Sequence, residues 1–243
     1  MSDQRSSGRV RADALGVLGE LVITAGVLVL LFVGWQLWWT DVTAEREQAH
    51  VVDQLERRFA DGPAARRGGA HPETDEGGAE VASGADADAI LRIPRFGSDY
   101  ARPIYSGTDE GTLRRGVGHY PRTAEPGAVG NFALAGHRTT YGRPFSDVER
   151  LVVGDRVLVE TAREYHVYRV TSSTIVDPSE SSVIAPVPGR VGSVPTEARL
   201  TLTTCHPRYS ARQRYIVHAD LVHTYPRAAG LPPEVLAAPT QEA

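Results

Sequence analysis

An uncharged, strongly apolar run near the amino terminus constrains this chain more than any other feature. The run Leu21–Trp39 (LVITAGVLVLLFVGWQLWW) contains no charged residue over 19 positions. As an α-helix it would be about 28 Å long, close to the ~30 Å thickness of the hydrocarbon core of a bilayer. Its C-terminal end holds Trp35, Trp38 and Trp39, and amphipathic rings favour the headgroup region. We therefore expect a transmembrane helix at residues 21–39.

The charges on the two sides of this run predict its orientation. Three arginines precede it and three acidic residues follow it: Arg5, Arg9, Arg11, Asp41, Glu45 and Glu47. The positive-inside rule predicts that residues 1–20 are cytoplasmic and that everything after the run lies outside the cell. A cleaved signal peptide is the alternative, with Val42-Thr43-Ala44 as a small-residue cleavage site. The apolar run exceeds the roughly 7–15 residues of a signal-peptide core, which favours a retained anchor.

Three further regions differ from a folded domain in composition. Residues 40–60 are predicted to form a polar juxtamembrane helix, because Val52, Leu55 and Phe59 recur at helical spacing. Residues 61–88 contain Val81 as their only large apolar residue, too little to offset the entropy of ordering, and predict a flexible linker. Residues 226–243 are rich in Pro and Ala, and we expect this tail to fray.

Between residues 89 and 225 the apolar runs are short and are broken by Gly and Pro. They predict strands at Ile90–Ile93, Ala101–Tyr105, Asn131–His137, Arg156–Thr161, Tyr165–Ile175, Ala198–Thr204 and Arg214–Val222. Short helical turns are expected at Gly111–Val117 and Pro144–Leu151. Seven or eight strands in about 137 residues favour an all-β closed barrel or sandwich over α/β layers.

Composition excludes several functional classes. The formal net charge is −4, and no basic excess points to a nucleic-acid partner. The single cysteine excludes an intramolecular disulfide and a multi-cysteine zinc site. No pair of histidines has the spacing of a zinc-binding helix, so we expect neither a metal nor another cofactor.

Strand alternation indicates which side chains can meet, because successive residues of a strand face opposite sides. In LTLTTC, Leu200 and Leu202 take the core face, which leaves Thr201, Thr203 and Cys205 on the other. By the same rule Ala133, Ala135 and His137 of NFALAGH share a non-core face, as do Arg214, Ile216 and His218 of RYIVHADL. Cysteine, histidine and arginine can therefore project from three strands over a groove floored by the two alanines.

This grouping suits acyl transfer, with a thiolate nucleophile, an imidazole acid/base and a guanidinium that stabilises an oxyanion. Each residue also has an ordinary interpretation. Cys205 can be a buried free thiol, His137 one of eight histidines with structural or solvent roles, and Arg214 a solvated surface charge. The shared face of all three favours the catalytic interpretation. His206 follows Cys205 directly, points to the opposite face and is a poor candidate for the base.

The stretches that carry these residues resemble a known family. Thr201–Pro207 (TLTTCHP), Asn131–Phe145 (NFALAGHRTTYGRPF) and Arg212–Ala219 (RQRYIVHA) are similar to the sortases, specifically to class E of high-GC Gram-positive bacteria. The resemblance covers residues 89–224. It implies a closed eight-stranded β-barrel, with Cys205 as nucleophile, His137 as acid/base and Arg214 as the oxyanion- or substrate-binding arginine.

The resemblance also implies a reaction and its partners. Cys205 would cleave a C-terminal sorting motif between Thr and Gly through a thioacyl enzyme, and an amine of a peptidoglycan precursor would accept the secreted protein. Class E is associated with Leu-Ala-x-Thr-Gly, and Tyr120 in Gly118–Pro121 (GHYP) matches the tyrosine thought to favour alanine. We expect substrate contacts from Tyr120, Ala133, Ala135, Thr203 and Thr204.

Three alternatives remain at this point. The first is a membrane-tethered cysteine peptidase that only hydrolyses its substrate. The second is a catalytically dead binding module, which need not keep cysteine, histidine and arginine together. The third is a pilin-polymerising sortase, but residues 61–88 contain no aromatic residue that could anchor a lid over the site.

Overall fold

The protein is described here from a computed structural model, which covers residues 4–61 and 87–237. The chain divides into two compact units, Met1–Val42 and Thr43–Ala243. The predicted linker lies outside the described residues except at its two ends. At its C-terminal end the prediction is wrong, because Ala87 and Asp88 already belong to the first strand.

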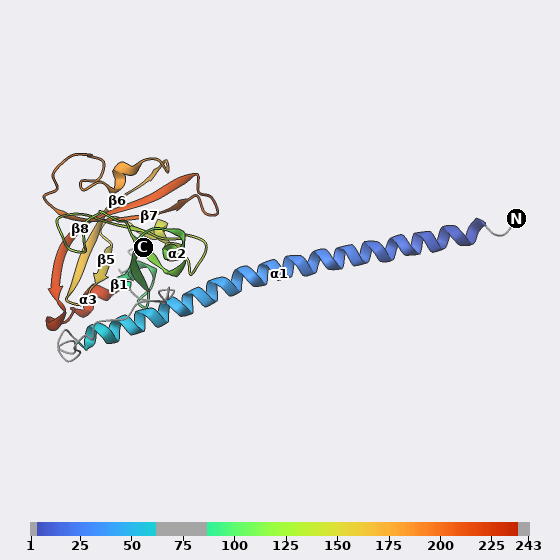
Figure 1. Cartoon of the computed structure of the whole chain (residues 1–243), viewed down its shortest axis with the longest axis horizontal. Coiled ribbons are helices and arrows are strands. Elements are labelled where there is room, and N and C mark those ends of the chain that lie inside the picture. Colours follow the sequence, from blue (N-terminus) through green and yellow to red (C-terminus); the bar gives the residue numbers. More distant parts are fainter. Residues whose placement is uncertain (1–3, 62–86, 238–243) are drawn as a thin grey trace, which may run out of the picture. The chain divides into compact units, whose positions relative to one another are not determined.

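A single α-helix, α1 (Gln4–Ala60), contains both the predicted anchor and the predicted juxtamembrane helix (Figure 1). From Leu18 onward it is the one helix among the described residues that is long and apolar enough to span a membrane. Its apolar side chains are exposed, as lipid-facing groups would be; Leu30, for example, is 74% exposed. These properties agree with a transmembrane anchor at 21–39.

The second unit is built around a closed barrel of eight strands in the order β1-β2-β3-β4-β7-β8-β6-β5 (Figure 1). The strands are β1 (Ala87–Arg92), β2 (Ala101–Ser106), β3 (Val117–His119), β4 (Gly130–Ala135), β5 (Arg156–Glu160), β6 (Glu164–Val176), β7 (Ala198–His206) and β8 (Gln213–Pro226). The predicted all-β fold and closed eight-stranded barrel are confirmed.

Short helical segments connect the strands. They are η2 (Pro94–Phe96), α2 (Glu110–Arg115), η3 (Val148–Arg150), η4 (Ser181–Ile184), η5 (Arg227–Ala229) and α3 (Pro233–Leu236). Helix α2 begins where the Asp109 carboxylate accepts a hydrogen bond from the Thr112 backbone N–H, a normal N-cap. Strand β3 was not predicted from the sequence, because it has only three residues, one of them glycine.

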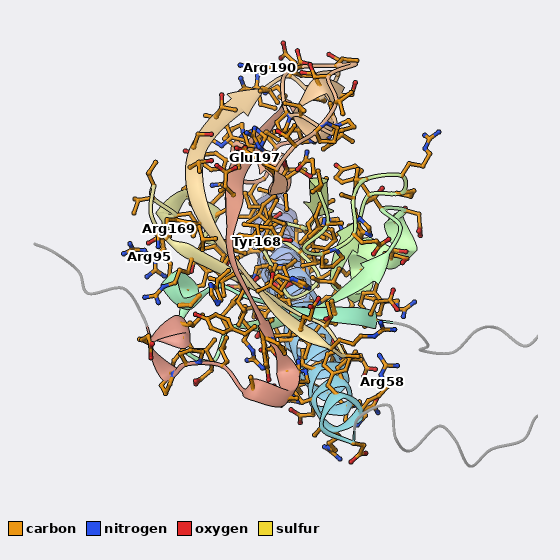
Figure 2. All side chains as sticks on the ribbon, turned by 90° about the vertical axis from the view of Figure 1, so that its left-hand side faces the viewer. Arg58, Arg95, Tyr168, Arg169, Arg190 and Glu197 are labelled. Atoms are coloured by element: carbon orange, nitrogen blue, oxygen red, sulfur yellow. The ribbon has the colours of Figure 1, made fainter. Side chains whose placement is uncertain are left out.

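The barrel interior is filled by the large apolar side chains of alternate strand positions. Leu200, Leu202 and Val217 are at most 1% exposed, and Tyr168 lies in the middle of the barrel (Figure 2). Figure 2 also shows Arg190 and Glu197, from the β6–β7 connection, at one end of the barrel and Arg58 of α1 at the other. The connection at the first end contributes to the candidate site.

Two segments outside the barrel pack more firmly than the sequence indicates. Val52, Leu55 and Phe59 of α1 are 3–5% exposed and form a small core with barrel residues. In the Pro- and Ala-rich tail, Val235 is 5% exposed and packs with Leu158 and Val167. The expectation that the tail frays from residue 226 is therefore wrong for residues 226–236, because the buried Val235 packs α3 against the barrel. Residues 238–243 lie outside the described part.

Candidate active site

The site forms where β7 lies between β4 and β8. Strand β7 pairs with β8 antiparallel, and this register places Cys205 directly opposite Arg214. Two residues earlier Thr203 is opposite Ile216, and Leu202 is opposite Val217 in the barrel core. The leucines thus face the interior, and Cys205 and Arg214 face the other side, as strand alternation predicts.

His137 follows β4 with one residue, Gly136, between them, and β4 pairs with β7 in parallel. The register matches Ala135 with Thr203, so two further positions bring His137 level with Cys205. Two hydrogen bonds hold the chain just before the histidine: the Gly136 N–H donates to the Thr203 carbonyl (3.2 Å), and the Thr204 hydroxyl donates to the Gly136 carbonyl (2.7 Å). The β4–β7 seam therefore fixes where the histidine leaves the sheet.

The His137 ring is half-buried beside the ring of Tyr141, with a centroid separation of 5.2 Å. Burial lowers the pKa of His137, the positive charge of Arg114 lowers it further, and Glu110 opposes this shift. Its buried Nε2 has no hydrogen-bond partner within the described part of the chain. An unpartnered ring nitrogen can exchange a proton with a bound substrate.

A cavity of about 160 Å³ opens beside Arg214. Its walls combine strand residues with the β6–β7 connection; its lining is Tyr120, Val176, Asp177, Pro178, Glu180, Ser181, Val183, Ile184, Thr203, Arg214 and Ile216. The lining combines apolar side chains and hydroxyls with the guanidinium of Arg214 and the carboxylates of Asp177 and Glu180, and this mixture fits a short peptide segment.

The Tyr120 hydroxyl is 3.0 Å from the Thr203 hydroxyl in the wall of this cavity. The Thr203 hydroxyl donates to the Leu134 carbonyl at 3.2 Å, which uses its only proton. Tyr120 is therefore the donor of the bond between the two hydroxyls, and its oxygen keeps acceptor capacity toward the cavity. A group that binds Tyr120 from the cavity side meets a hydrogen-bond acceptor.

The other residues expected to contact substrate are placed differently. Ala133 and Ala135 are 0% and 7% exposed and do not line this cavity. Thr204 is 3% exposed, and its hydroxyl is committed to the Gly136 carbonyl. Of the five expected contacts, Tyr120 and Thr203 reach the cavity.

The structure separates the three arginines that follow Cys205. Arg214 lies in β8, and its Nη1 donates to the carbonyls of Ala211 (2.9 Å) and Gln213 (3.0 Å). Arg212 is exposed and precedes the strand. Arg208 is exposed and binds the Ser146 carbonyl. Arg214 alone among them is in register with the thiol and lines the cavity.

One residue of the site escaped the sequence analysis. Arg138 is only 2% exposed, and its Nη1 donates to the Cys205 carbonyl at 3.3 Å and to His206 Nδ1 at 3.0 Å. Its Nη2 forms an ion pair with Glu149 at 2.5 Å, which neutralises the buried charge. The residue after His137 thus binds the backbone of Cys205. Among 26 arginines, its position next to the histidine was the only available signal.

Metal binding finds no support in this region. In the part of the chain that the structure describes, no group of three or more His, Cys, Asp or Glu side chains could hold a metal ion. His206 binds Arg138, and His218 binds the Thr201 hydroxyl at 2.9 Å, so both rings have structural partners.

An eight-stranded closed barrel with a cysteine and an arginine in register, and a histidine at the end of the neighbouring strand, defines a sortase-type site. The sortase domain family matches residues 91–222, more than half of the chain. The chain belongs to the sortase family.

Several relatives belong to class E. Sortase SrtE1 of Streptomyces coelicolor is 38% identical over 243 aligned residues, which cover 95% of this chain and 65% of that protein. This chain therefore spans just under two thirds of that relative's length. The predicted similarity to class E sortases is confirmed.

Solved structures agree with this assignment. Sortase E from Streptomyces avermitilis has 40% identity and a TM-score of 0.56, covering 61% of this chain and 96% of that one. A crystal structure of sortase E1 from Streptomyces coelicolor with a tripeptide in the active site has 39% identity and a TM-score of 0.57, covering 62% and 96%.

Proposed function

We propose that the protein is a cysteine transpeptidase that cleaves a sorting motif between Thr and Gly and transfers the protein to a cell-wall amine. The observation that carries the proposal is the pairing of Cys205 with Arg214 across β7 and β8, with His137 at the adjoining end of β4. The single thiol of the chain thus has an acid/base and a cation as neighbours.

The first half of the reaction forms a thioester. The Cys205 thiolate attacks the Thr carbonyl carbon, and the carbonyl oxygen becomes an oxyanion. The C–N bond to Gly then breaks, and the His137 imidazolium gives its proton to the departing amine. The buried Nε2 of His137, without a partner among the described residues, is the nitrogen suited to this transfer.

The second half transfers the acyl group. An acceptor amine, supplied by a peptidoglycan precursor, attacks the thioester carbonyl, and the neutral His137 takes the proton that this amine loses. The C–S bond breaks and returns the thiolate, so protons and charges balance over the cycle. Arg214 stabilises both oxyanions, because it lies opposite Cys205 and its Nη1 is fixed by two loop carbonyls.

The proposed substrate segment is Leu-Ala-x-Thr-Gly at the C-terminus of secreted proteins. The tripeptide in the active site of the sortase E1 relative supports binding of a short peptide in this cavity. Tyr120, whose oxygen is an acceptor toward the cavity, would receive a substrate backbone N–H. An alanine at the second motif position retains that N–H, whereas a proline has none.

The proposed location follows from the sequence and from α1. Residues 21–39 would anchor the protein in the membrane as a single span, with residues 1–20 in the cytoplasm and the barrel outside the cell. This location would place the site beside secreted substrates and cell-wall precursors.

The test incubates the full chain in detergent micelles with Leu-Ala-x-Thr-Gly and Leu-Pro-x-Thr-Gly peptides, with and without an added amine. We expect an amine-linked product from the alanine peptide, and no product from the Cys205→Ala variant. Cleavage that ignores the amine would instead identify a hydrolysing cysteine peptidase.

A further inference from the structure

The C-terminal part of α1 is bound to the barrel by an apolar seam. Val52, Leu55 and Phe59, at 3–5% exposure, pack against Ala87, Ile90 and Tyr105 of β1 and β2. Burying three such apolar side chains stabilises the contact between the helix and the barrel. The helix that follows the membrane segment in sequence is therefore part of the catalytic domain.

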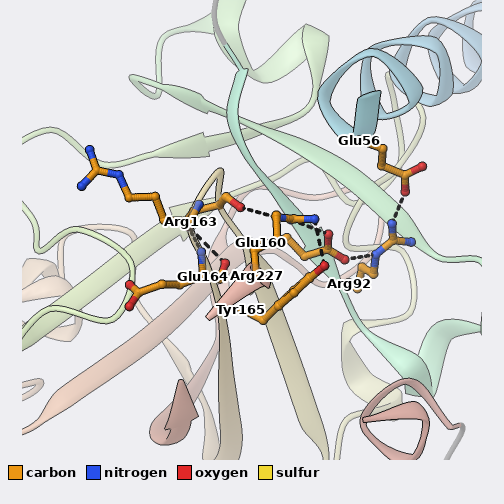
Figure 3. Close-up of polar contacts among 8 residues, drawn as sticks. Glu56, Arg92, Glu160, Arg163, Glu164, Tyr165 and Arg227 are labelled. Carbon is orange, nitrogen blue, oxygen red and sulfur yellow. Dashed lines mark hydrogen bonds and ion pairs between the residues drawn. The ribbon is translucent and has the colours of Figure 1, made fainter. Parts of the chain in front are cut away.

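Charged side chains extend this contact (Figure 3). Glu56 of α1 pairs with Arg92 of β1, Arg92 pairs with Glu160, and Glu160 binds Arg227 at 3.0 Å. Arg92, Glu160 and Arg227 are at most 17% exposed. A network of shielded charges fixes the register of a helix on a surface better than an isolated exposed pair does.

About one turn before the apolar seam, the helix reaches the loop that follows the histidine. Gln48 is 1% exposed, and its Nε2 donates to the Tyr141 carbonyl at 2.9 Å. The next residue, Gly142, is in close contact with the same side chain: an added Cβ would be 2.9 Å from Gln48 Nε2, so the Gln48 amide would have to shift. Glu45 and Arg143 form a longer ion pair at 3.5 Å beside this contact.

The loop that Gln48 contacts has an uncommon backbone. Tyr141, Gly142 and Arg143 have φ values of +54°, +75° and +45°, three successive residues in the left-handed region. Two of them are not glycine, and such residues persist in this region only where surrounding contacts hold them. The Gln48 amide supplies one of these contacts from a helix about ninety residues away in sequence.

The same loop sets the surroundings of the acid/base. The Tyr141 ring is 5.2 Å from the His137 ring, and the His137 carbonyl accepts from the Phe145 N–H at 3.0 Å. A change in the backbone at Tyr141 would therefore move the ring that packs on His137. Contacts run without a gap from Gln48 through Tyr141 to His137.

We infer that Gln48 is a positioning residue: the docked juxtamembrane helix holds the 141–143 loop in its left-handed conformation and thereby orients His137. The inference rests on the proposed function for its effect on turnover, whereas its structural content does not. It makes the helix after the anchor a requirement for full activity as well as a spacer between membrane and barrel.

The sharpest variant is Gln48→Met, made in the full chain in detergent micelles. Methionine keeps the length of the side chain, and it removes a buried Oε1 that has no partner within the described residues, so the melting temperature should hold. The Tyr141 carbonyl, however, loses its donor. A merely structural role for Gln48 therefore predicts no kinetic change. A positioning role predicts a fall in kcat of about tenfold with KM unchanged, the loss expected for one hydrogen bond.

Gln54→Met is the matched control, because Gln54 lies on the same helix and is exposed. A second readout is independent of turnover: the ring NMR signals of His137 in a Cys205→Ala background should shift with Gln48→Met and stay in place with Gln54→Met. A kcat within twofold of the parent, or unshifted His137 signals, would overturn the inference. Should the parent chain form no thioacyl enzyme with sorting peptides, the proposed function fails, and the NMR comparison still decides the role of Gln48.

Discussion

Cys205 and His137, the residues proposed as nucleophile and acid/base, are held in different ways. Cys205 is the last residue but one of the nine-residue strand β7, and it pairs directly with Arg214 of β8. His137 lies just beyond the end of β4, in a loop with three successive left-handed residues. The thiol and the guanidinium are thus positioned by backbone hydrogen bonds between β7 and β8. The imidazole depends on side chains from other elements that hold the residues around His137.

This difference indicates which part of the site tolerates substitution of neighbouring side chains. A strand register is maintained by many hydrogen bonds together, so loss of one side chain leaves Cys205 and Arg214 in place. The loop around His137 depends on separate contacts: the Thr204 hydroxyl on Gly136, the Gln48 amide on Tyr141 and the Tyr141 ring itself. Substitutions near the histidine should therefore alter chemistry while the barrel stays folded.

The largest effect is expected from removing the loop-borne group itself. His137→Ala should lower the turnover of a sorting peptide by about 10²–10⁴-fold, because it removes the group proposed to protonate the leaving amine. His206→Ala is the control, since that ring is engaged by Arg138 and belongs to the residue that alternates with Cys205 along β7. A greater loss from His206→Ala than from His137→Ala would reverse the assignment.

The strand-borne cation comes next. Arg214→Lys keeps the charge but loses the forked donors, and it should lower kcat/KM by ~10²–10³-fold. Arg212→Lys, two residues earlier and exposed, should be mild. Turnover of both variants on one peptide, with folding checked by thermal melting, measures this. If Arg212→Lys were inactive and Arg214→Lys active, the register of β7 and β8 would not identify the arginine that serves the reaction.

Substitution of Tyr120 tests how the cavity wall selects the substrate, and it leaves the reacting groups unchanged. Tyr120→Phe removes the oxygen proposed to accept the substrate N–H and should reduce the alanine-over-proline preference by about 2–10-fold, the value of one hydrogen bond. The ratio of kcat/KM for the two peptides measures it. Thr203→Val loses the partner of Tyr120 but keeps the phenol, and it should change the ratio less. An unchanged ratio in Tyr120→Phe would leave this tyrosine a purely structural role.

The smallest effect concerns the electrostatics of the loop. Arg114→Ala removes a charge that lowers the pKa of His137, so this pKa should rise; Glu110→Gln should lower it. Both side chains are at least half exposed, so solvent screens their charges, and small shifts of the His137 pKa are expected in a histidine NMR titration. Shifts of the opposite signs would contradict the described surroundings of the ring.

The same pKa direction has a consequence for stability. The folded state binds the His137 proton less tightly than the unfolded chain, whose histidine pKa is about 6.5. This contribution to stability is therefore complete above pH ~6.5 and is lost as the pH falls below it. Denaturant titrations at pH 7.5 and 5.5 should show less of this loss in His137→Gln than in the parent.

Much of the barrel could be predicted from the sequence, because its signals are local. Alternation in LTLTTC and RYIVHADL placed Cys205 and Arg214 on the non-core face, as their register has it. Strand β3 is too short to have a pattern, and its glycine weakens the signal. Alternation therefore assigned the faces of Cys205 in β7 and Arg214 in β8, and it gave no signal for the three-residue β3.

The contacts around the histidine could not be predicted, since they join residues far apart in sequence. Gln48 and Tyr141 are 93 positions apart, and the sequence around neither residue indicates that the two are hydrogen-bonded. Thr204 shows a related limit: its place next to Cys205 suggested substrate contact, whereas its hydroxyl holds Gly136. Alternation predicts which face of the sheet a strand residue occupies, but it does not predict which group that residue contacts.

Acylation of Cys205 is the step on which the proposed function depends, and mass spectrometry of the digested protein detects it. The full chain is mixed with a Leu-Ala-x-Thr-Gly peptide, quenched in acid within the first turnovers and digested. We expect an added mass equal to the peptide through its Thr less one water, on the fragment that contains Cys205, and none in Cys205→Ala. Turnover without that adduct, or near-normal turnover in Cys205→Ala, would contradict it.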